Sequence, residues 1–125
     1  PATLPSDAVI AATAAEAAGH DLTVVLVNKA WDTTVTDPRG SQQRLVAALL
    51  ATGRPVVVVA VRDPYDIAHL PGVRTYLASY SYTRAAMDTL VRALHGELSP
   101  RGRLPVTIPA ADGGVPYPYG HGLTW

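Results

Sequence analysis

The chain has 125 residues, of which 48% are hydrophobic and 16% are charged, and this balance excludes intrinsic disorder as its main state. The length is typical of one domain, so we expect residues 1–125 to form a single domain with a core of its own. Ten basic side chains balance ten acidic ones, which argues against nucleic acid or an anionic membrane as a partner.

Cysteine is absent, which excludes disulfides and thiolate chemistry but leaves the compartment open. No apolar run approaches the ~20 residues of a transmembrane helix, so we expect no membrane span. The sequence does not open with a signal peptide. Because it starts at Pro1 rather than at a methionine, we interpret it as a processed or excised piece of a longer protein.

The first predicted helix covers residues 8–18, of which seven are alanine, the best helix former. Ser6 precedes it as a capping residue, and Gly19 is a plausible C-cap. Val9 and Ile10 are its large apolar residues, and we expect both to anchor it to the rest of the molecule.

A strand is predicted over residues 22–27, because these residues present almost no polar face. The loop that follows, residues 28–40, has 13 residues, whereas about two to six are usual between a strand and a helix. Unusual loop length indicates a functional role. The loop carries four side chains of interest: Lys29, Trp31, Asp32 and Asp37.

The second predicted helix covers residues 41–51, and Gly53 closes it. Leu45 and Leu49 fall on one face, together with either Val46 or Leu50.

The strand predicted over residues 55–61 organises the fold, because its run of valines has no polar face. A strand covered by helices on both sides reads as such a continuous apolar run, whereas a strand with one wet face alternates. We therefore expect an inner strand of a parallel sheet. A buried helix is the alternative, but β-branched valines favour a strand. Asp63 and Pro64 end the strand and turn the chain.

The rest of the chain continues the alternation of strands and helices. One or two helical turns are predicted over residues 64–70, a strand over residues 73–79 and a helix over residues 83–94 with Thr83 as N-cap. The inner side of that helix is expected to carry Ala86, Leu90, Val91 and Leu94. From Gly96 onward the tail has no periodicity. This order predicts an α/β fold, a three-layer α/β/α sandwich with a mostly parallel, flavodoxin-like sheet.

No pattern indicates a metal or cofactor. The four histidines (His20, His69, His95 and His121) lie far apart, and no pair has a ligand spacing. Neither a G-x-G-x-x-G nor a Walker pattern follows any predicted strand, which makes nucleotide binding improbable despite the fold class. We therefore expect no metal and no cofactor.

Two segments at the ends of predicted strands hold reactive side chains. For Asp63 and Asp66, which flank a helix start, capping of the turn is favoured over catalysis. Residues 79–83 combine hydroxyls with the aromatic rings of Tyr80 and Tyr82, which suit sugars. A turn and helix cap is nevertheless favoured there over a serine nucleophile, since no G-x-S-x-G is present.

Two further features of the sequence, the arginines of residues 101–103 and Trp31, each allow two interpretations. The arginines of residues 101–103 could bind an anion, although surface arginine at a turn is the more ordinary interpretation. Trp31 is the best candidate for a ring that stacks on a sugar or fills an interface, and burial under the sheet edge is its alternative. With Asp32, Tyr80 and Tyr82 it forms the predicted substrate-binding or domain-seam set, and no catalytic residue is predicted.

Three segments resemble the C-terminal domain of glycoside hydrolase family 3. The first combines Gln42 or Gln43, Leu45-Val46 and the strand at residues 54–61. The second, and most specific, is a helix ending in LHG at residues 94–96 and then SPRGRLPVTIP at residues 99–109. This stretch is similar to the family's "G…P-x-G-x-L-P-V-T-x-P". The third is YPYGHGL at residues 117–123, similar to the family's closing "Y-P-[FY]-G-x-G-L".

The resemblance implies that this chain is the accessory C-terminal domain of a β-glycosidase. In the family, an N-terminal TIM-type barrel carries the nucleophile, and the α/β sandwich docks against the barrel's active-site face. The barrel would thus be the partner, with carbohydrate at the seam, and this chain would be inactive alone. An extracellular or cell-envelope location is also favoured by the resemblance.

The loop at residues 28–40 bears on the branch of the family. In the β-glucosidase branch the corresponding loop supplies the general acid/base glutamate, whereas this loop has no glutamate. The β-N-acetylhexosaminidase branch takes its acid/base from a His–Asp pair on the barrel, so the chain resembles that branch more. It would act on terminal N-acetylglucosamine of chitooligosaccharides or cell-wall glycans. The β-glucosidase/β-xylosidase branch stays open as an alternative, and so does a free-standing α/β interaction domain.

The resemblance also implies an incomplete sheet. The family's domain begins with a further strand and helix before the first predicted helix, and this chain lacks them. A sheet edge and apolar surface would then be uncovered, and such edges favour self-association.

Overall fold

The computed structural model describes residues 4–110 and 113–125. Its elements are α1 (Asp7–Ala17), β1 (Thr23–Val27), α2 (Ser41–Ala51), β2 (Val56–Ala60), the 3-10 helix η1 (Pro64–His69), β3 (Thr75–Ala78) and α3 (Arg84–Leu94). Every predicted strand and long helix is present, with strand ends one or two residues shorter than predicted. Within the described residues, no helix is both long and apolar enough to span a membrane.

The sheet has three parallel strands in the order β1-β2-β3. Val58 pairs with Val25 on one side and with Tyr76 on the other. The valine-rich strand is therefore the inner one, as its continuous apolar run predicted. The side chain of Val58 is completely buried.

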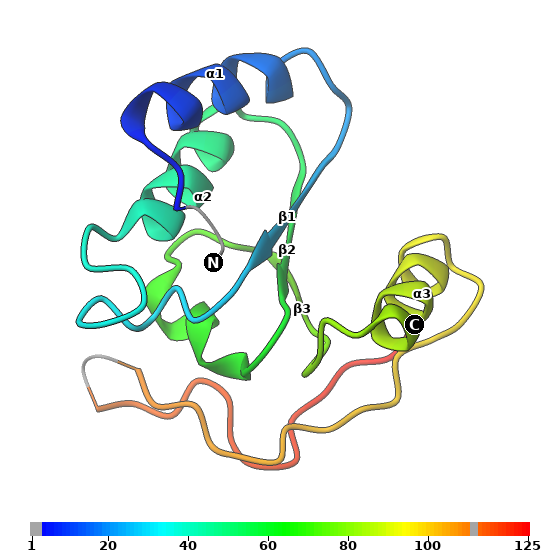
Figure 1. The fold of residues 1–125 in the computed structure, drawn as a ribbon. Helices are drawn as coiled ribbons and strands as arrows, with labels where there is room; N and C mark the ends of the chain where they lie inside the picture. Colours follow the sequence, from blue (N-terminus) through cyan, green and yellow to red (C-terminus); the bar gives the residue numbers. More distant parts are fainter. Residues whose placement is uncertain (1–3, 111–112) are drawn as a thin grey trace.

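The helices form two layers, one on each face of the sheet (Figure 1). On one face, α2 packs on the sheet, and α1 packs against α2. α3 covers the other face beside β2 and β3. The α/β/α sandwich expected from the sequence is confirmed.

The helix faces correct some of the expectations. In α1 only Ile10 is buried, and Val9 is 51% exposed, so the expectation that both anchor the helix is wrong for Val9. Gly19 follows the C-cap, which is Ala18. In α3, Leu90 is buried while Val91 is 52% exposed, because Ala93 takes the inward position instead.

α2 resolves the open choice on its buried face. Val46 and Leu49 are both buried, and Leu45 and Leu50 pack beside them with partial exposure. The largest part of the core lies under this helix. Its buried members are Ala17, Val25, Val27, Ala30, Val46, Leu49, Val56, Val58, Ala60 and Leu70.

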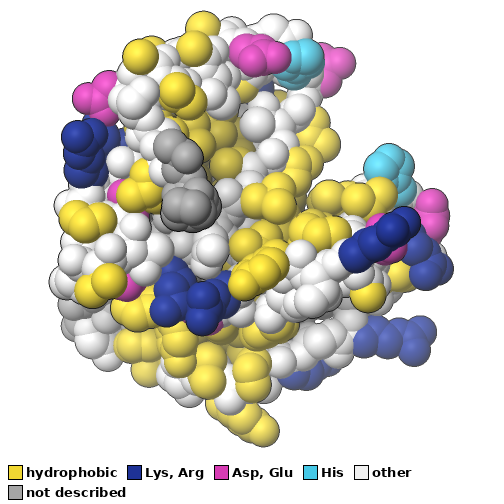
Figure 2. All heavy atoms as spheres, in the orientation of Figure 1, with side chains coloured by type: hydrophobic (Ala, Val, Ile, Leu, Met, Phe, Trp, Pro, Cys, Tyr) yellow, Lys and Arg dark blue, Asp and Glu magenta, His cyan; other side chains and the backbone are white. Residues whose placement is uncertain are grey.

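The opposite face of the sheet is covered only in part. Side chains of β1 alternate, so that Val25 and Val27 are buried under α2 while Val24 and Leu26 are 38% and 52% exposed. α3 packs over Val59 and Val61, and the cluster that it forms with them contains no β1 residue. Hydrophobic side chains line the recess between α3 and the rest of the molecule (Figure 2). Among the described residues β1 pairs with β2 alone, which makes it an edge strand of this sheet.

The tail after α3 runs across the carboxyl ends of the strands and folds back on itself (Figure 1). The main-chain N–H of Ile108 donates to Tyr117 O, and that of Leu104 donates to His121 O. Gly120 N–H donates to Leu104 O in return. The two tail motifs that carried the family resemblance therefore pair with each other, and Ile108 of the first motif is buried at 1% exposure.

Candidate functional site

Trp31 is held by two carboxylates from the connection between β2 and β3. Its main-chain N–H donates to Oδ1 of Asp66 at 3.0 Å, and its indole Nε1–H donates to Oδ1 of Asp63 at 2.7 Å. The ring of Tyr65 lies edge-on to the indole, with centroids 6.1 Å apart. Three residues of one short segment thus fix a tryptophan that lies more than 30 positions earlier in the chain.

The predicted capping role of Asp63 and Asp66 is wrong. Asp63 does occupy the N-cap position of η1, but its side chain makes no capping hydrogen bond. Asp66 lies in the first turn of η1 and reaches the main chain of Trp31 instead. A sequence pattern cannot distinguish the two roles, because the N–H groups that compete for the carboxylates come from a distant loop.

Asp66 is a buried acid with an incomplete set of partners. Its side chain is fully buried, and its Oδ2 has no hydrogen-bond partner among the described residues. Burial raises the pKa of Asp66 to about 6, and the neighbouring charge of Asp63 adds to this effect. The same burial raises the pKa of Tyr76 beside it, whose hydroxyl donates to Pro64 O.

Asp32, a predicted site residue, holds the loop together. Its two carboxylate oxygens accept hydrogen bonds from the main chain and hydroxyl of Thr34, the main chain of Val35, and the main chain and hydroxyl of Thr36. The hydroxyl bonds from Thr36 and Thr34 are the main reason that the pKa of Asp32 lies well below its ordinary value. The carboxylate stays ionised and is used structurally.

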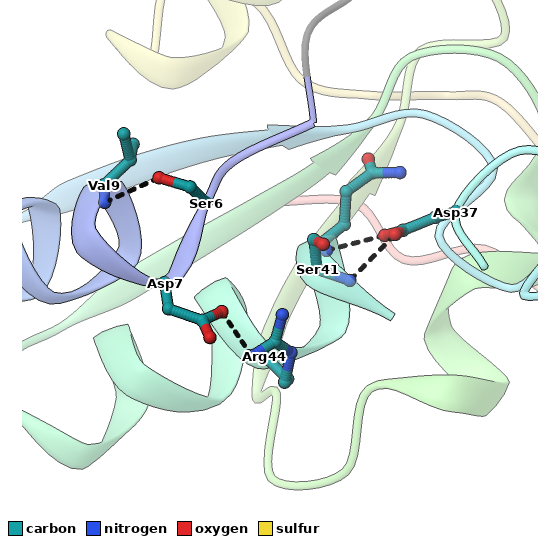
Figure 3. A network of polar contacts seen from close by, with 7 residues as sticks. Ser6, Asp7, Val9, Asp37, Ser41 and Arg44 are labelled. Carbon is teal, nitrogen blue, oxygen red and sulfur yellow. Dashed lines mark hydrogen bonds and ion pairs between the residues drawn. The ribbon is translucent and has the colours of Figure 1, made fainter. Parts of the chain in front are cut away.

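Asp37 caps α2 from outside the helix. Gly40 occupies the N-cap position at φ 59° and has no side chain to offer, so Asp37 Oδ1 and Oδ2 accept from Ser41 N–H at 2.8 Å and Gln42 N–H at 2.7 Å. Figure 3 shows this cap beside the ion pair of Asp7 and Arg44, which joins α1 to α2. Asp37 is completely buried.

A cavity of about 260 Å³ opens beside the half-buried Trp31 ring. Trp31, Tyr65, Ala68, His69, Ile108 and Pro109 line it, so it joins the loop, η1 and the tail. The ammonium of Lys29 lies over the indole, 5.9 Å from the ring centroid. Lys29 has φ 53°, a strained conformation for a side-chain-bearing residue, and such strain is often found at functional sites.

Tyr80 and Tyr82 follow β3 at the same edge of the sheet. Their side chains are 41% and 64% exposed, and Tyr80 also has a positive φ of 57°. Burial of part of its ring raises the pKa of Tyr80. No hydrogen bond or ring contact between described residues joins either tyrosine to Trp31 or Asp32. The structure thus places the four predicted site residues at one edge without bringing them into one contact set.

The hydroxyls of residues 79–83 shape the turn before α3. Ser79 Oγ–H donates to Ser81 O at 2.8 Å, and Ser81 Oγ accepts from Thr83 N–H at 3.1 Å. Thr83 occupies the N-cap position, but its own side chain does not cap the helix. Within the described residues, no group of three or more histidine, cysteine or acidic side chains could hold a metal ion.

The comparisons with known proteins all find glycoside hydrolases or their domains. The Glycosyl hydrolase family 3 C-terminal domain matches residues 2–125. A putative beta-xylosidase of Formosa agariphila is 29% identical over 74% of this chain, and a beta-glucosidase of Rhizobium radiobacter is 34% identical over 84% of it. These alignments span only 12% and 14% of the two relatives.

A solved structure is similar as well. It is described as a fungal multi-domain GH3 beta-N-acetylglucosaminidase with a glucosamine N-acetyltransferase region. The similarity has a TM-score of 0.68 at 32% identity and covers 77% of this chain and 11% of that one. With the family match over nearly the whole length, the paired tail motifs and the α/β/α architecture, the chain belongs to the glycosyl hydrolase family 3 C-terminal domains.

Proposed function

We propose that this domain serves a β-N-acetylhexosaminidase, in which it docks on an N-terminal TIM-type barrel. The enzyme removes terminal N-acetylglucosamine from chitooligosaccharides or cell-wall glycans. The barrel carries the catalytic groups, and the chain contributes the edge around Trp31 to the seam or to the substrate. The short span of this chain in its multi-domain relatives supports a partner domain over a free-standing interaction domain.

The observation that carries this proposal is the state of the carboxylates in residues 28–40. The loop has no glutamate, and Asp32 and Asp37 are its only acidic residues. Five hydrogen bonds occupy the carboxylate of Asp32, and Asp37 is buried as the cap of α2. A general acid/base needs a carboxyl within reach of the glycosidic oxygen with a pKa near the working pH. The hydrogen bonds to Asp32 hold its pKa well below the ordinary value, and the carboxylate of Asp37 is buried as the cap of α2, which favours an acid/base supplied by the barrel.

A second candidate is a β-glucosidase or β-xylosidase. The sequence relatives named above carry those names, and their identity to this chain is close to that of the structural neighbour named as a beta-N-acetylglucosaminidase. The two candidates differ in the sugar that is cleaved and in where the acid/base lies.

The deciding experiment uses the intact enzyme with three aryl glycosides: the N-acetyl-β-glucosaminide, the β-glucoside and the β-xyloside. We expect the highest kcat/KM on the N-acetyl-β-glucosaminide. Asp32→Asn and Asp37→Asn should each lower kcat less than about tenfold, below the range for a general acid/base. A hundredfold loss for either variant, rescued by azide, or a preference for the glucoside or xyloside would contradict the proposal.

The chain by itself should release no chromophore from any of the three glycosides. Retaining hydrolysis needs two carboxyls about 5 Å apart, and the acids of this edge have other partners. Release above that of a heat-killed control would show that the domain carries catalysis.

Trp31→Ala in the intact enzyme should raise KM with little change in kcat, because the ring would bind ground state and transition state alike. A matched control is Trp125→Ala, which removes an exposed tryptophan at the end of the tail. A loss confined to kcat would exclude a binding role for Trp31.

A further inference from the structure

The two carboxylates that hold Trp31 differ in what they contact and in how costly they are. Asp63 is partly exposed and takes the indole N–H at the rim. Asp66 is fully buried and takes the main-chain N–H, which fixes where the backbone of the loop begins its course over the strands. The indole ring is therefore set by two anchors, one on the backbone and one on the ring.

Asp66 is a poor choice for stability alone. Its Oδ2 is buried with no hydrogen-bond partner in the part of the chain that the structure describes, and a buried polar atom without a hydrogen bond is costly. The neighbouring carboxylate of Asp63 adds to the cost of ionising Asp66, because like charges repel. An asparagine would supply the same acceptor to Trp31 N–H without the charge.

A carboxylate differs from an amide in that the strength of its hydrogen bonds depends on its charge. A hydrogen bond from N–H to an ionised carboxylate is roughly twice as strong as one to a neutral acceptor. The main-chain N–H of Trp31 donates to the Asp66 carboxylate, and the main-chain N–H of Ala30 also acts on it to lower its pKa. Loss of its charge therefore weakens the hold on two consecutive residues of the loop at once.

We propose that Asp66 is a positioning residue whose charge state sets how firmly the domain holds Trp31, so that binding through the Trp31 ring strengthens when Asp66 ionises. The effect on binding rests on the proposed function, in which Trp31 contacts the domain seam or the substrate. Its structural part concerns this chain alone. The groups that face Asp66 are the N–H groups of the loop, Asp63 on the connection to η1 and Tyr76 on β3.

The structural part is tested by nuclear magnetic resonance on the ¹⁵N-labelled 125-residue chain, with Trp125→Phe to leave one indole signal. We expect the main-chain amide signal of Trp31 to shift with a midpoint near pH 6, where the pKa of Asp66 lies. The shift should vanish in Asp66→Asn. Asp63→Asn is the matched control, which should displace the indole signal and keep the amide transition, with its midpoint at a lower pH because the neighbouring charge is gone.

The functional part is tested by the ratio of KM in Asp66→Asn to KM in the unaltered intact enzyme, measured across pH. The ratio cancels titrations of the barrel that both enzymes share. We expect it to rise from about one at pH 5 to between about two and ten at pH 7.5, with an unchanged kcat ratio. A flat KM ratio would remove the consequence for binding.

The two arms separate the possible failures. An amide signal of Trp31 that stays constant between pH 5 and pH 7.5, or that still titrates in Asp66→Asn, overturns the proposal. If Asp66→Asn does not fold, the titration of the unaltered chain decides alone. A preference of the intact enzyme for glucosides would refute the proposed function and leave the positioning role intact.

Discussion

The two faces of the sheet are built from the same apolar strands, but helices cover one face more completely than the other. On the face under α2, β1 and β2 contribute Val25, Val27, Val56 and Val58, all buried beneath the helix. On the α3 face, β2 contributes Val59 and Val61 to a smaller cluster, while Val24 and Leu26 of β1 remain exposed. The β1 strand is thus apolar on both sides, and only one side is covered.

This difference distinguishes the face of the sheet that the chain covers with its own helix from the face that it leaves partly open. A strand with a solvated face normally alternates apolar with polar residues, and β1 does not. Within the described residues, β1 thus combines an uncovered apolar face with an edge position, and both features are typical of a contact surface. The face under α2 therefore contributes the larger part of the buried core that stabilises this chain.

The largest effect is expected for Val58→Asp. The substitution places an unpaired charge in a completely buried position of the central strand, which costs several kcal/mol. Chemical denaturation followed by circular dichroism should find no cooperative unfolding transition, or one at a much lower denaturant concentration. Soluble Val58→Asp protein with an unchanged transition would contradict the role of the covered face.

A smaller effect is expected from truncating one leucine on each face. Leu49 is 1% exposed under α2, and Leu90 is 9% exposed under α3. Leu49→Ala should lower the free energy of unfolding by about 2–5 kcal/mol, the usual range for a buried leucine. Leu90→Ala should cost at least about 1 kcal/mol less, because its surroundings can collapse into the open recess. Equal losses in denaturation experiments would mean that the two faces are equally complete.

The smallest effect on stability is expected for Leu26→Asp, the exposed counterpart of Val58→Asp. Its cost should lie within about 0.5 kcal/mol, as for other surface substitutions. The same change should reduce self-association, which we expect for the isolated chain because the apolar face and edge of β1 are open. Sedimentation should show association for the unaltered chain and less of it for Leu26→Asp. A strict monomer at high concentration before substitution would refute that expectation.

Most of the fold could be predicted from the sequence because its signals are local. The run of valines indicated an inner strand, and the apolar spacing in residues 41–51 indicated a helix with Leu49 inside. The errors concern direction. Val9 and Val91 are apolar residues on helices, but which apolar residues face inward depends on how each helix is rotated against the sheet. The rotation of a helix about its axis cannot be predicted from its residue types alone.

The site was predicted less completely. The loop at residues 28–40 stood out by its length, and Trp31 by its type, and both lie at the carboxyl edge of the sheet. Asp63 and Asp66 were interpreted as local caps. Their partner is 32 and 35 residues away, and no local spacing announces a hydrogen bond over that distance.

The sequence by itself determined the α/β class, the inner strand and the family, because continuous apolar runs and the two tail motifs are properties of short segments. The tertiary structure decided which carboxylates are free. Asp32 is used by its own loop, Asp37 by the start of α2, and Asp63 and Asp66 by Trp31. A carboxylate takes its role from the donors around it and from its burial, and for Asp63 and Asp66 the donors meet the carboxylates only when distant segments pack together.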